Sequence, residues 1–469
     1  MGDLFDYTPK VDAFENANPT KKVLDYHRKL VIHFKNYEDK VKFEQQTGIV
    51  FGNKKELVFN PDLINKTTLV DYEISEKNNP EYEKKYSWQK FYKDMPEYIT
   101  NDLLEHTYTV IFMNEDDITT FKNITGFKLT EKTKFVWWPE TEKQVKKDLV
   151  WKSRKDWQPK YPLFIVSKGR ASIEGTAKYL LWMGVKLFYL IVEEQEYAEY
   201  NKYFDAEHLL ILPKEYQQKY ETVDPEGDAK GLPVGSGAAR NFAWDTSIKM
   251  GYEKHWVMDD NIFGFFRFND NLQIKMKTPI CFRVVEDFCD RYDNIYMAGM
   301  QYYCFIIEKS YRTPIEPNTR IYSCNLIRND IPYRWRCRYN EDTDLSLRIL
   351  KDGHGTALFT SFLINKANTQ TCKGGNTDTI YHIGTGVKSR ALARLHPDVT
   401  KVVYKYGRIH HEVNYQPFLY NDWKLKEDFE YDGGDHEYDM YMDTLEEGED
   451  FASWCKRYNE SRGIVKDGK

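Results

Sequence analysis

The sequence contains no run of about 18 apolar residues, so it predicts no transmembrane helix. Its seven cysteines include no Cys-x-x-Cys pair and follow no regular spacing. This irregular set excludes a disulfide framework and a zinc knuckle and favours reduced thiols. The opening residues, MGDLFDYTPK, are acidic and polar, unlike a secretory signal. We therefore expect a soluble, cytoplasmic protein.

An excess of positive charge is also absent, because the formal net charge is −6. This balance excludes whole-molecule attraction to nucleic acid, so any such binding needs a local basic face. Aromatic residues, in contrast, make up 16% of the chain, with 35 Tyr and 11 Trp. So many rings cannot all be buried, and we expect exposed stacking surfaces for sugars or bases. A length of 469 residues predicts two or three domains.

The first 150 residues contain an internal repeat at an offset of 78. The residues Phe34, Asn36, Asp39, Phe43, Thr47 and Gly48 recur as Phe112, Asn114, Asp117, Phe121, Thr125 and Gly126. Each copy predicts a strand followed by a helix, with Asn as the N-cap and Gly after the last turn. We expect residues 1–150 to form an accessory α+β region of two β-α units, or one interleaved module, that binds DNA or a partner. The charged stretch Glu140–Lys160 predicts a linker.

From Tyr161 the pattern changes to apolar strands that alternate with helices, which predicts an α/β domain over residues 161–420 with a mostly parallel, doubly wound sheet. The predicted strands are residues 163–167, 185–194, 208–213 and 255–261. Ligands bind such sheets at the carboxyl ends of the strands. The residues after each strand are therefore the candidates for a site. Residues 421–469 are acidic and predict a loosely attached segment or a small cap.

The turn Asp259-Asp260-Asn261 follows the fourth of these strands. Paired carboxylates beside a buried strand are costly unless a cation is present, and such oxygen ligands suit Mg²⁺ or Mn²⁺. The same pattern also occurs in receiver domains, phosphatases and helix caps. The turn is therefore either a metal site or one of these other arrangements.

The helix before that strand opens with GSGAARN (235–241). Small residues allow close approach of a ligand, and Arg240 offers a fixed cation for a phosphate or for the aspartate pair. The segment lacks the Lys-Ser/Thr of a phosphate loop, and a dinucleotide fingerprint would follow the first strand. Kinase-type and Rossmann-dehydrogenase interpretations are therefore excluded.

A third acidic group, Glu341 and Asp342, opens a helix about 80 residues further along. Acids in a first helical turn are ordinary. A carboxylate that returns to the same cleft is also a candidate general base, and we choose Asp342 with Glu341 as the alternative.

These three motifs, in this order, resemble those of GT-A glycosyltransferases. The chain from about Tyr161 to Phe418 resembles, more specifically, the TET/JBP-associated glycosyltransferases of bacteriophages, which are related to the base J glucosyltransferase. The matching segments are PLFIVSKGRA (162–171), GSGAARN (235–241), WVMDDN (256–261), YNEDTDLSLRIL (339–350) and GRIHHEVNY (407–415).

The resemblance implies a GT-A type, Rossmann-like fold and a metal-dependent, inverting transfer of glucose or arabinose from a UDP-sugar. It implies as acceptor a 5-hydroxymethylpyrimidine, first of all 5-hydroxymethylcytosine, in double-stranded phage DNA in the host cytoplasm. The implied metal is Mn²⁺ or Mg²⁺. A GT-A enzyme for a polysaccharide, lipid or protein acceptor would carry the same motifs, and a non-catalytic binding protein is the other alternative.

The resemblance also implies residue roles. Donor binding falls to Ser167, Lys168, Arg170, Arg240, Asp259, Lys388 and His411. Metal binding falls to Asp259, Asp260, Asn261 and His411. The metal turn reads Asp-Asp-Asn rather than Asp-x-Asp, which leaves open which two oxygens bind the ion. For His411, a packing role is the alternative.

A basic and aromatic run is the candidate DNA face. It comprises Arg334, Trp335, Arg336 and Arg338, with Arg320 and Arg328 nearby. The alternative to a DNA-binding face is an arginine-rich strand with one face in solvent.

Overall fold

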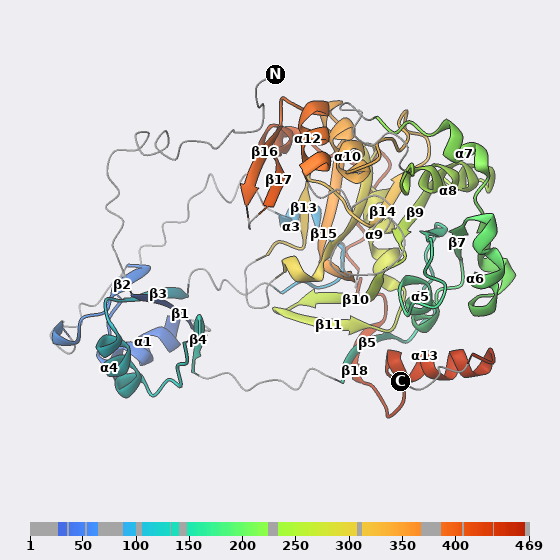
Figure 1. The fold of residues 1–469 in the computed structure, drawn as a ribbon. Helices are drawn as coiled ribbons and strands as arrows, with labels where there is room; N and C mark the ends of the chain where they lie inside the picture. The colour runs from blue at the N-terminus through green and yellow to red at the C-terminus, as the bar shows by residue number, and fades with distance from the viewer. Residues whose placement is uncertain are drawn as a thin grey trace, which may run out of the picture. The chain divides into compact units, whose positions relative to one another are not determined.

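The computed structural model describes residues 27–34, 37–51, 54–63, 88–99, 106–131, 133–139, 148–223, 233–306, 312–366, 386–405, 408–434 and 436–464. The chain divides into two compact units (Figure 1). One comprises residues 1–76 and 102–143, and the other comprises residues 77–101 and 144–469.

The first unit is a small α+β fold that contains the sequence repeat. Its elements are β1 (Arg28–Phe34), α1 (Tyr37–Thr47), β2 (Glu56–Val58), a short 3-10 turn η2 (Pro61–Leu63), β3 (Thr107–Phe112), α4 (Glu115–Thr125) and β4 (Phe135–Trp138). Helices α1 and α4 begin 78 residues apart, since 115 − 37 = 78. The sheet order is β2-β3-β1-β4, in which β2 pairs with β3 and β4 pairs with β1. The two copies therefore exchange strands and form one interleaved module.

The predicted caps are present where the structure describes them. The Oδ1 atom of Asn114 accepts a hydrogen bond from the backbone N–H of Asp117 at 2.8 Å. Gly48 and Gly126 follow the two helices with φ of +71° and +73°, a conformation that glycine adopts without strain. The predicted cap Asn36 lies outside the described residues.

The second unit is an α/β fold around a 12-stranded sheet. The strands of this sheet are β5 (Leu149–Ser153), β6 (Leu163–Val166), β7 (Phe188–Val192), β8 (Leu209–Ile211), β9 (Lys254–Asp259), β10 (Ile262–Asn269), β11 (Leu272–Met276), β12 (Ile295–Tyr302), β13 (Ile315–Pro317), β14 (Cys324–Arg328), β15 (Gly355–Lys366) and β18 (Met440–Thr444). A separate antiparallel pair consists of β16 (Thr400–Lys405) and β17 (Arg408–Val413). The helices are α3 (Trp88–Phe91), α5 (Thr176–Met183), α6 (Tyr197–Tyr203), α7 (Lys214–Lys219), α8 (Gly237–Lys249), α9 (Ile280–Asp290), α10 (Glu341–Lys351), α12 (Gly386–Leu395) and α13 (Phe451–Ser461), with 3-10 turns η3 (Glu194–Glu196), η4 (Ala206–His208), η5 (Tyr303–Phe305) and η7 (Gln416–Tyr420).

The order β18-β5-β11-β10-β15-β12-β14-β9-β6-β7-β8 contains a parallel, Rossmann-like part, β9-β6-β7-β8. This confirms the predicted α/β class and the small α+β region before it. Strand β14 is antiparallel to both β9 and β12, and β12 is parallel to β15. Strands β6, β7, β9, β12 and β15 therefore all end at the same edge of the sheet.

Both faces of the sheet are covered, which explains the uninterrupted apolar strands. Leu163 and Ile165 of β6 belong to a core with residues of α5 and α9. Phe164 and Val166, which point to the other face, belong to a core with residues of α8 and α10. This packing fixes α8 and α10 on the same face of the sheet, next to the ends of β6 and β9.

Two segments at the ends of this unit are more ordered than their composition indicates. Leu149–Ser153, inside the predicted linker, is strand β5 and pairs with β11. In the acidic segment 421–469, β18 pairs with β5 and α13 packs on α5, where Lys178 Nζ donates to Asn459 Oδ1 at 2.9 Å. Across the described residues, no helix has the length and apolar character that crossing a membrane requires.

Candidate functional site

A cavity of about 340 Å³ lies at the edge of the large sheet where β6, β7, β9, β12 and β15 end. All eleven residues predicted for catalysis, donor binding and metal binding line it, namely Ser167, Lys168, Arg170, Arg240, Asp259, Asp260, Asn261, Glu341, Asp342, Lys388 and His411. The switch point between β6 and β9 supplies the first group of them, as expected for an open α/β sheet. Helices α8, α10 and α12 and strand β17 supply the rest.

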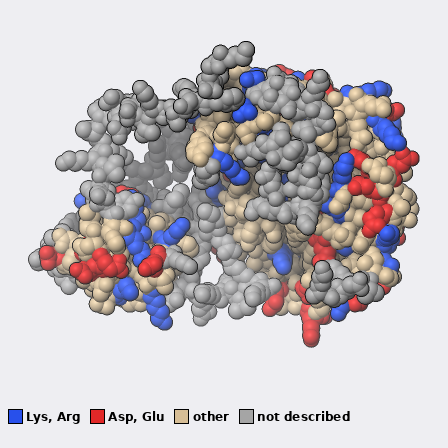
Figure 2. Space-filling model, viewed as in Figure 1, with Lys and Arg blue, Asp and Glu red and all other residues tan. Residues whose placement is uncertain are grey.

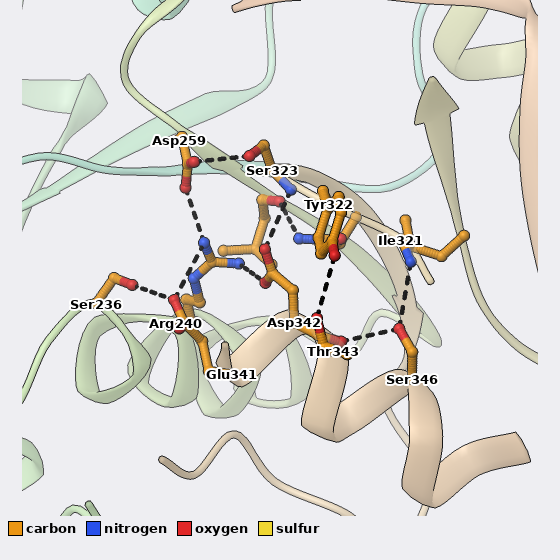
Figure 3. Close-up of polar contacts among 12 residues, drawn as sticks. Ser236, Arg240, Asp259, Ile321, Tyr322, Ser323, Glu341, Asp342, Thr343 and Ser346 are labelled. Carbon is orange, nitrogen blue, oxygen red and sulfur yellow. Dashed lines mark hydrogen bonds and ion pairs between the residues drawn. The ribbon is translucent and has the colours of Figure 1, made fainter. Parts of the chain in front are cut away.

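Arg240 lines the cavity and joins two acids from distant segments (Figure 3). Its Nη2 donates to Asp259 Oδ1 at 2.8 Å and its Nη1 donates to Asp342 Oδ1 at 2.7 Å. The side chain is 2% exposed, and its guanidinium lies 4.8 Å from the ring centre of Trp335. Charge-assisted bonds of this kind are short and directional. Arg240 therefore fixes Asp342 relative to the end of β9.

The two acids held by Arg240 have opposite protonation behaviour. Burial raises the pKa of Asp342 to about 7, against the lowering effect of Arg240 and with a further increase from Glu341. Burial also raises the pKa of Asp259, but Lys366 and Arg240 outweigh it and hold that pKa well below its usual range. Asp259 is therefore a permanent anion, whereas Asp342 can exchange a proton near neutral pH.

Asp260 has a separate set of partners on the loop after β6. Arg170 Nη1 donates to its Oδ1 at 2.6 Å, and Ser167 Oγ donates to its Oδ2 at 2.7 Å. The hydroxyl of Tyr200 lies 2.6 Å from Ser167 Oγ and accepts from the backbone N–H of Arg170 at 3.1 Å. Burial raises the pKa of Asp260, and Arg170 opposes this effect. The loop after the first strand is thus tied directly to the aspartate turn.

The remaining predicted residues lie around this centre. Lys168 Nζ donates to Glu193 Oε1 at 2.7 Å, and Ser236 Oγ donates to Glu341 Oε1 at 2.7 Å. Burial lowers the pKa of Lys388. Among the described residues, the lining contains five cationic side chains, Lys168, Arg170, Arg240, Lys366 and Lys388, and five acidic ones, Glu193, Asp259, Asp260, Glu341 and Asp342. The formal charges of these ten side chains balance. A bound diphosphate would add two negative charges, and a divalent cation can offset them.

The cavity contains donor atoms of the chemical types that such a cation binds. Asn261 Oδ1 and His411 Nδ1 are buried and have no hydrogen-bond partner in the structure. Burial lowers the pKa of His411 to about 4, so its imidazole is neutral near pH 7, as metal binding requires. The carboxylates of Asp259 and Asp260 line the same cavity, and their oxygens accept from Arg240, Lys366, Ser323, Arg170 and Ser167. Among the described residues, Asp259, Asp260 and His411 are not one of the groups whose ligand atoms lie within 4.8 Å of one another.

A second group of ligand-type side chains in the same unit is formed by Asp94, Asp432 and His436. One ligand atom from each lies within 4.8 Å of the others. None of the three lines the cavity. His436 Nε2 and Asp432 Oδ1 are 2.6 Å apart, and Gly433 N donates to Asp94 Oδ2 at 3.1 Å.

The structure buries two of the four residues predicted for the DNA face. Trp335 is 1% exposed and Arg338 is 8% exposed. Arg336 Nε donates to the buried Asp344 at 3.0 Å, and Arg338 donates to a backbone carbonyl. Only Arg334 presents a substantially exposed side chain, at 43%. Trp335 and Arg338 are therefore buried, Arg336 is half-buried in its ion pair with Asp344, and Arg334 is exposed.

Sequence reasoning missed several residues that line the cavity or support it. Lys366 and Ser323 both donate to Asp259 Oδ2, the latter at 2.8 Å, and Tyr302 lies 2.7 Å from Ser323. Tyr302 and Lys366 end β12 and β15. The sequence analysis took its candidate site residues from the ends of the first four strands. Applied to β12 and β15, the same rule predicts Tyr302 and Lys366.

Comparison with known families identifies the part of the chain that carries this site. Residues 161–375 match the family model described as TET-Associated Glycosyltransferase. The matched region is 215 of 469 residues, from 375 − 161 + 1, and it contains nine of the eleven predicted residues. Lys388 and His411 follow it. No curated protein matches the chain.

Proposed function

Residues 161–375 belong to the TET-associated glycosyltransferase family, so the chain contains a glycosyltransferase domain, and we propose the following reaction for it. The protein transfers glucose or arabinose from a UDP-sugar to the hydroxyl of a 5-hydroxymethylpyrimidine in phage DNA, with 5-hydroxymethylcytosine as the first candidate. The observation that carries the proposal is the pair of bonds from Arg240 to Asp259 and Asp342 inside one cavity.

Asp342 is the proposed general base. Its pKa of about 7 lies near physiological pH, where a carboxylate is both available and basic enough to take a proton. The acceptor hydroxyl gives its proton to Asp342, and its oxygen bonds to the anomeric carbon. The bond between that carbon and the diphosphate breaks, and the electron pair leaves with the nucleoside diphosphate. Attack from the face opposite the leaving group inverts the anomeric centre.

Cationic side chains on three elements would hold the donor diphosphate. Arg170 follows β6, Arg240 lies on α8 and Lys388 lies on α12. We assign Asn261, His411 and the carboxylates of Asp259 and Asp260 to a bound Mn²⁺ or Mg²⁺. When bound, that ion supplies positive charge to the diphosphate as it departs.

The test is a transfer assay with the full chain and a panel of UDP-sugars. The acceptors are three DNA duplexes that contain hydroxymethylcytosine, hydroxymethyluracil or only ordinary bases, and the readout is mass spectrometry of the released nucleosides. We expect a hexose or pentose adduct on a hydroxymethylated nucleoside, formed about 10²- to 10⁴-fold more slowly by the Asp342→Asn protein. If an oligosaccharide, lipid or peptide is labelled and no DNA is, the DNA acceptor is wrong and the acceptor is a polysaccharide, lipid or protein.

A further inference from the structure

The antiparallel pair β16–β17 forms a ribbon, and one face of it carries the cavity-lining residue His411. Val402 lies opposite His411, and Tyr404 lies opposite Ile409. Residues directly opposite in an antiparallel pair point to the same side. His411 lines the cavity, and Val402, Tyr404 and Ile409 lie on the same face of the ribbon without lining the cavity themselves.

The two ends of the ribbon differ in their surroundings. At the inner end, Thr400 is 6% exposed and its N–H donates to His396 O at 2.8 Å. At the outer end, Tyr404 is 73% exposed, Val402 is 43% exposed and Ile409 is 37% exposed. An anchored ribbon thus presents a tyrosine ring and two aliphatic side chains to solvent, beside a cavity that has to admit an acceptor.

The opposite face of the ribbon is basic. It carries Lys401, Lys405, Arg408 and His410, with Glu412 as the one acid among the described residues of this face. Lys401 and Lys405 both pair with Glu412, and Arg408 Nε donates to His410 Nε2 at 3.0 Å. Three cations against one carboxylate leave a net charge of +2 with His neutral. Figure 2 shows Lys and Arg side chains in the area where Figure 1 places the ribbon.

We propose that this ribbon is the surface that binds the acceptor DNA strand, with a base stacked on Tyr404 and phosphates bound by Lys401, Lys405 and Arg408. The proposal rests on the DNA acceptor of the proposed function. A base inside a duplex cannot reach a buried donor, so it must be turned out of the stack. An exposed ring on one face of the ribbon provides stacking for an unstacked base, and the cations on the opposite face of the same two strands attract the backbone of the strand that passes the ribbon.

Tyr420 provides a matched control, because it is 71% exposed and lies on η7, outside the ribbon. We would measure anisotropy of labelled hydroxymethylcytosine DNA with wild type, Tyr404→Ala and Tyr420→Ala, and UDP binding by calorimetry. Loss of one stacked base weakens binding by about 5- to 100-fold. We expect that loss, with a matching rise in KM for DNA, in Tyr404→Ala alone, and unchanged UDP affinity in all three proteins.

A second variant tests the basic face. Lys401→Gln with Lys405→Gln should lower the slope of log affinity against log salt by about 1 to 2, since each phosphate contact contributes about 0.9. If Tyr404→Ala and Tyr420→Ala bind and modify DNA equally well, the ribbon proposal is wrong while the transfer to DNA stands. If wild type modifies no DNA, the proposed function fails as well. If Tyr404→Ala instead impairs transfer to a non-nucleic acceptor, the ribbon binds that class and the DNA assignment is overturned.

Discussion

The guanidinium of Arg240 lies 2.7 Å from Asp342 Oδ1, yet Asp342 retains a pKa of about 7. A cation this close normally lowers the pKa of a carboxyl group. Here burial outweighs it, and Glu341 and Asp259 add to the increase while Lys366 opposes it. The same arginine therefore orients Asp342 without suppressing its basicity, which is the combination that a general base requires.

The first prediction concerns the pH dependence of transfer. Asp342 acts as a base only when it is ionised, so kcat/KM should rise as the pH increases and should level off above about 7. Replacement by the isosteric amide, Asp342→Asn, should lower kcat by about 10²- to 10⁴-fold. Glu341→Gln is the matched control, because it is the neighbouring acid in the same cavity. An equal loss in both variants, or full activity in Asp342→Asn, would reject Asp342 as the base.

The second prediction concerns the stability that Arg240 provides. Arg240→Met leaves Asp342 and Asp259 without their shared buried cation, and loss of one partner of a buried pair costs about 3 to 5 kcal/mol. Lys186→Met removes an ion pair whose side chains are 70% and 61% exposed, and it should cost at most about 1 kcal/mol. Urea unfolding followed by tryptophan fluorescence compares the two variants. Equal losses would mean that the Arg240 pairs do not stabilise the fold.

Much of the candidate site could be predicted from the sequence, because each buried strand is an apolar run and the residue that ends the run can be located. The turn at Asp259 and the loop at Arg170 were found in this way. The ion pair of Arg336 and the burial of Arg338 could not be predicted, because both depend on partners that the fold brings into contact. Asp344 and the carbonyl of Pro233 supply those partners here. Strand β5 was missed because charged residues surround its short apolar core.

The third prediction concerns metal binding, measured apart from activity. Mn²⁺ bound to the metal-depleted protein with UDP can be followed by electron paramagnetic resonance. His411→Ala and Asn261→Ala each remove a buried atom that has no partner in the structure, and each should weaken Mn²⁺ binding by about 10-fold or more. His410→Ala is the control, since the side chain of His410 points to the face of the ribbon opposite to that of His411. Equal effects of His410→Ala and His411→Ala would exclude His411 as a ligand.

The last prediction concerns acid stability and the buried Asp344. Its carboxylate accepts from Arg336 Nε at 3.0 Å and Arg348 Nε at 2.8 Å, and it lies 3.0 Å from His396 Nε2. Burial raises the pKa of Asp344, but His396 and the two arginines outweigh it and lower the pKa from 3.8 to about 2. The ionised form is therefore favoured by folding.

This depressed pKa sets the sign of the effect. The stabilisation, about 2 kcal/mol, is fully present above pH 4 and is lost as the pH falls toward about 2. In Asp344→Asn the free energy of unfolding should fall by about 3 to 5 kcal/mol at pH 7, and its decline between pH 4 and 2 should flatten. Asp422→Asn, an exposed carboxylate, should change neither quantity. An unaltered acid decline in Asp344→Asn would show that other carboxylates cause it, and that Arg336, Arg348 and His396 stabilise the helix α10 region independently of Asp344.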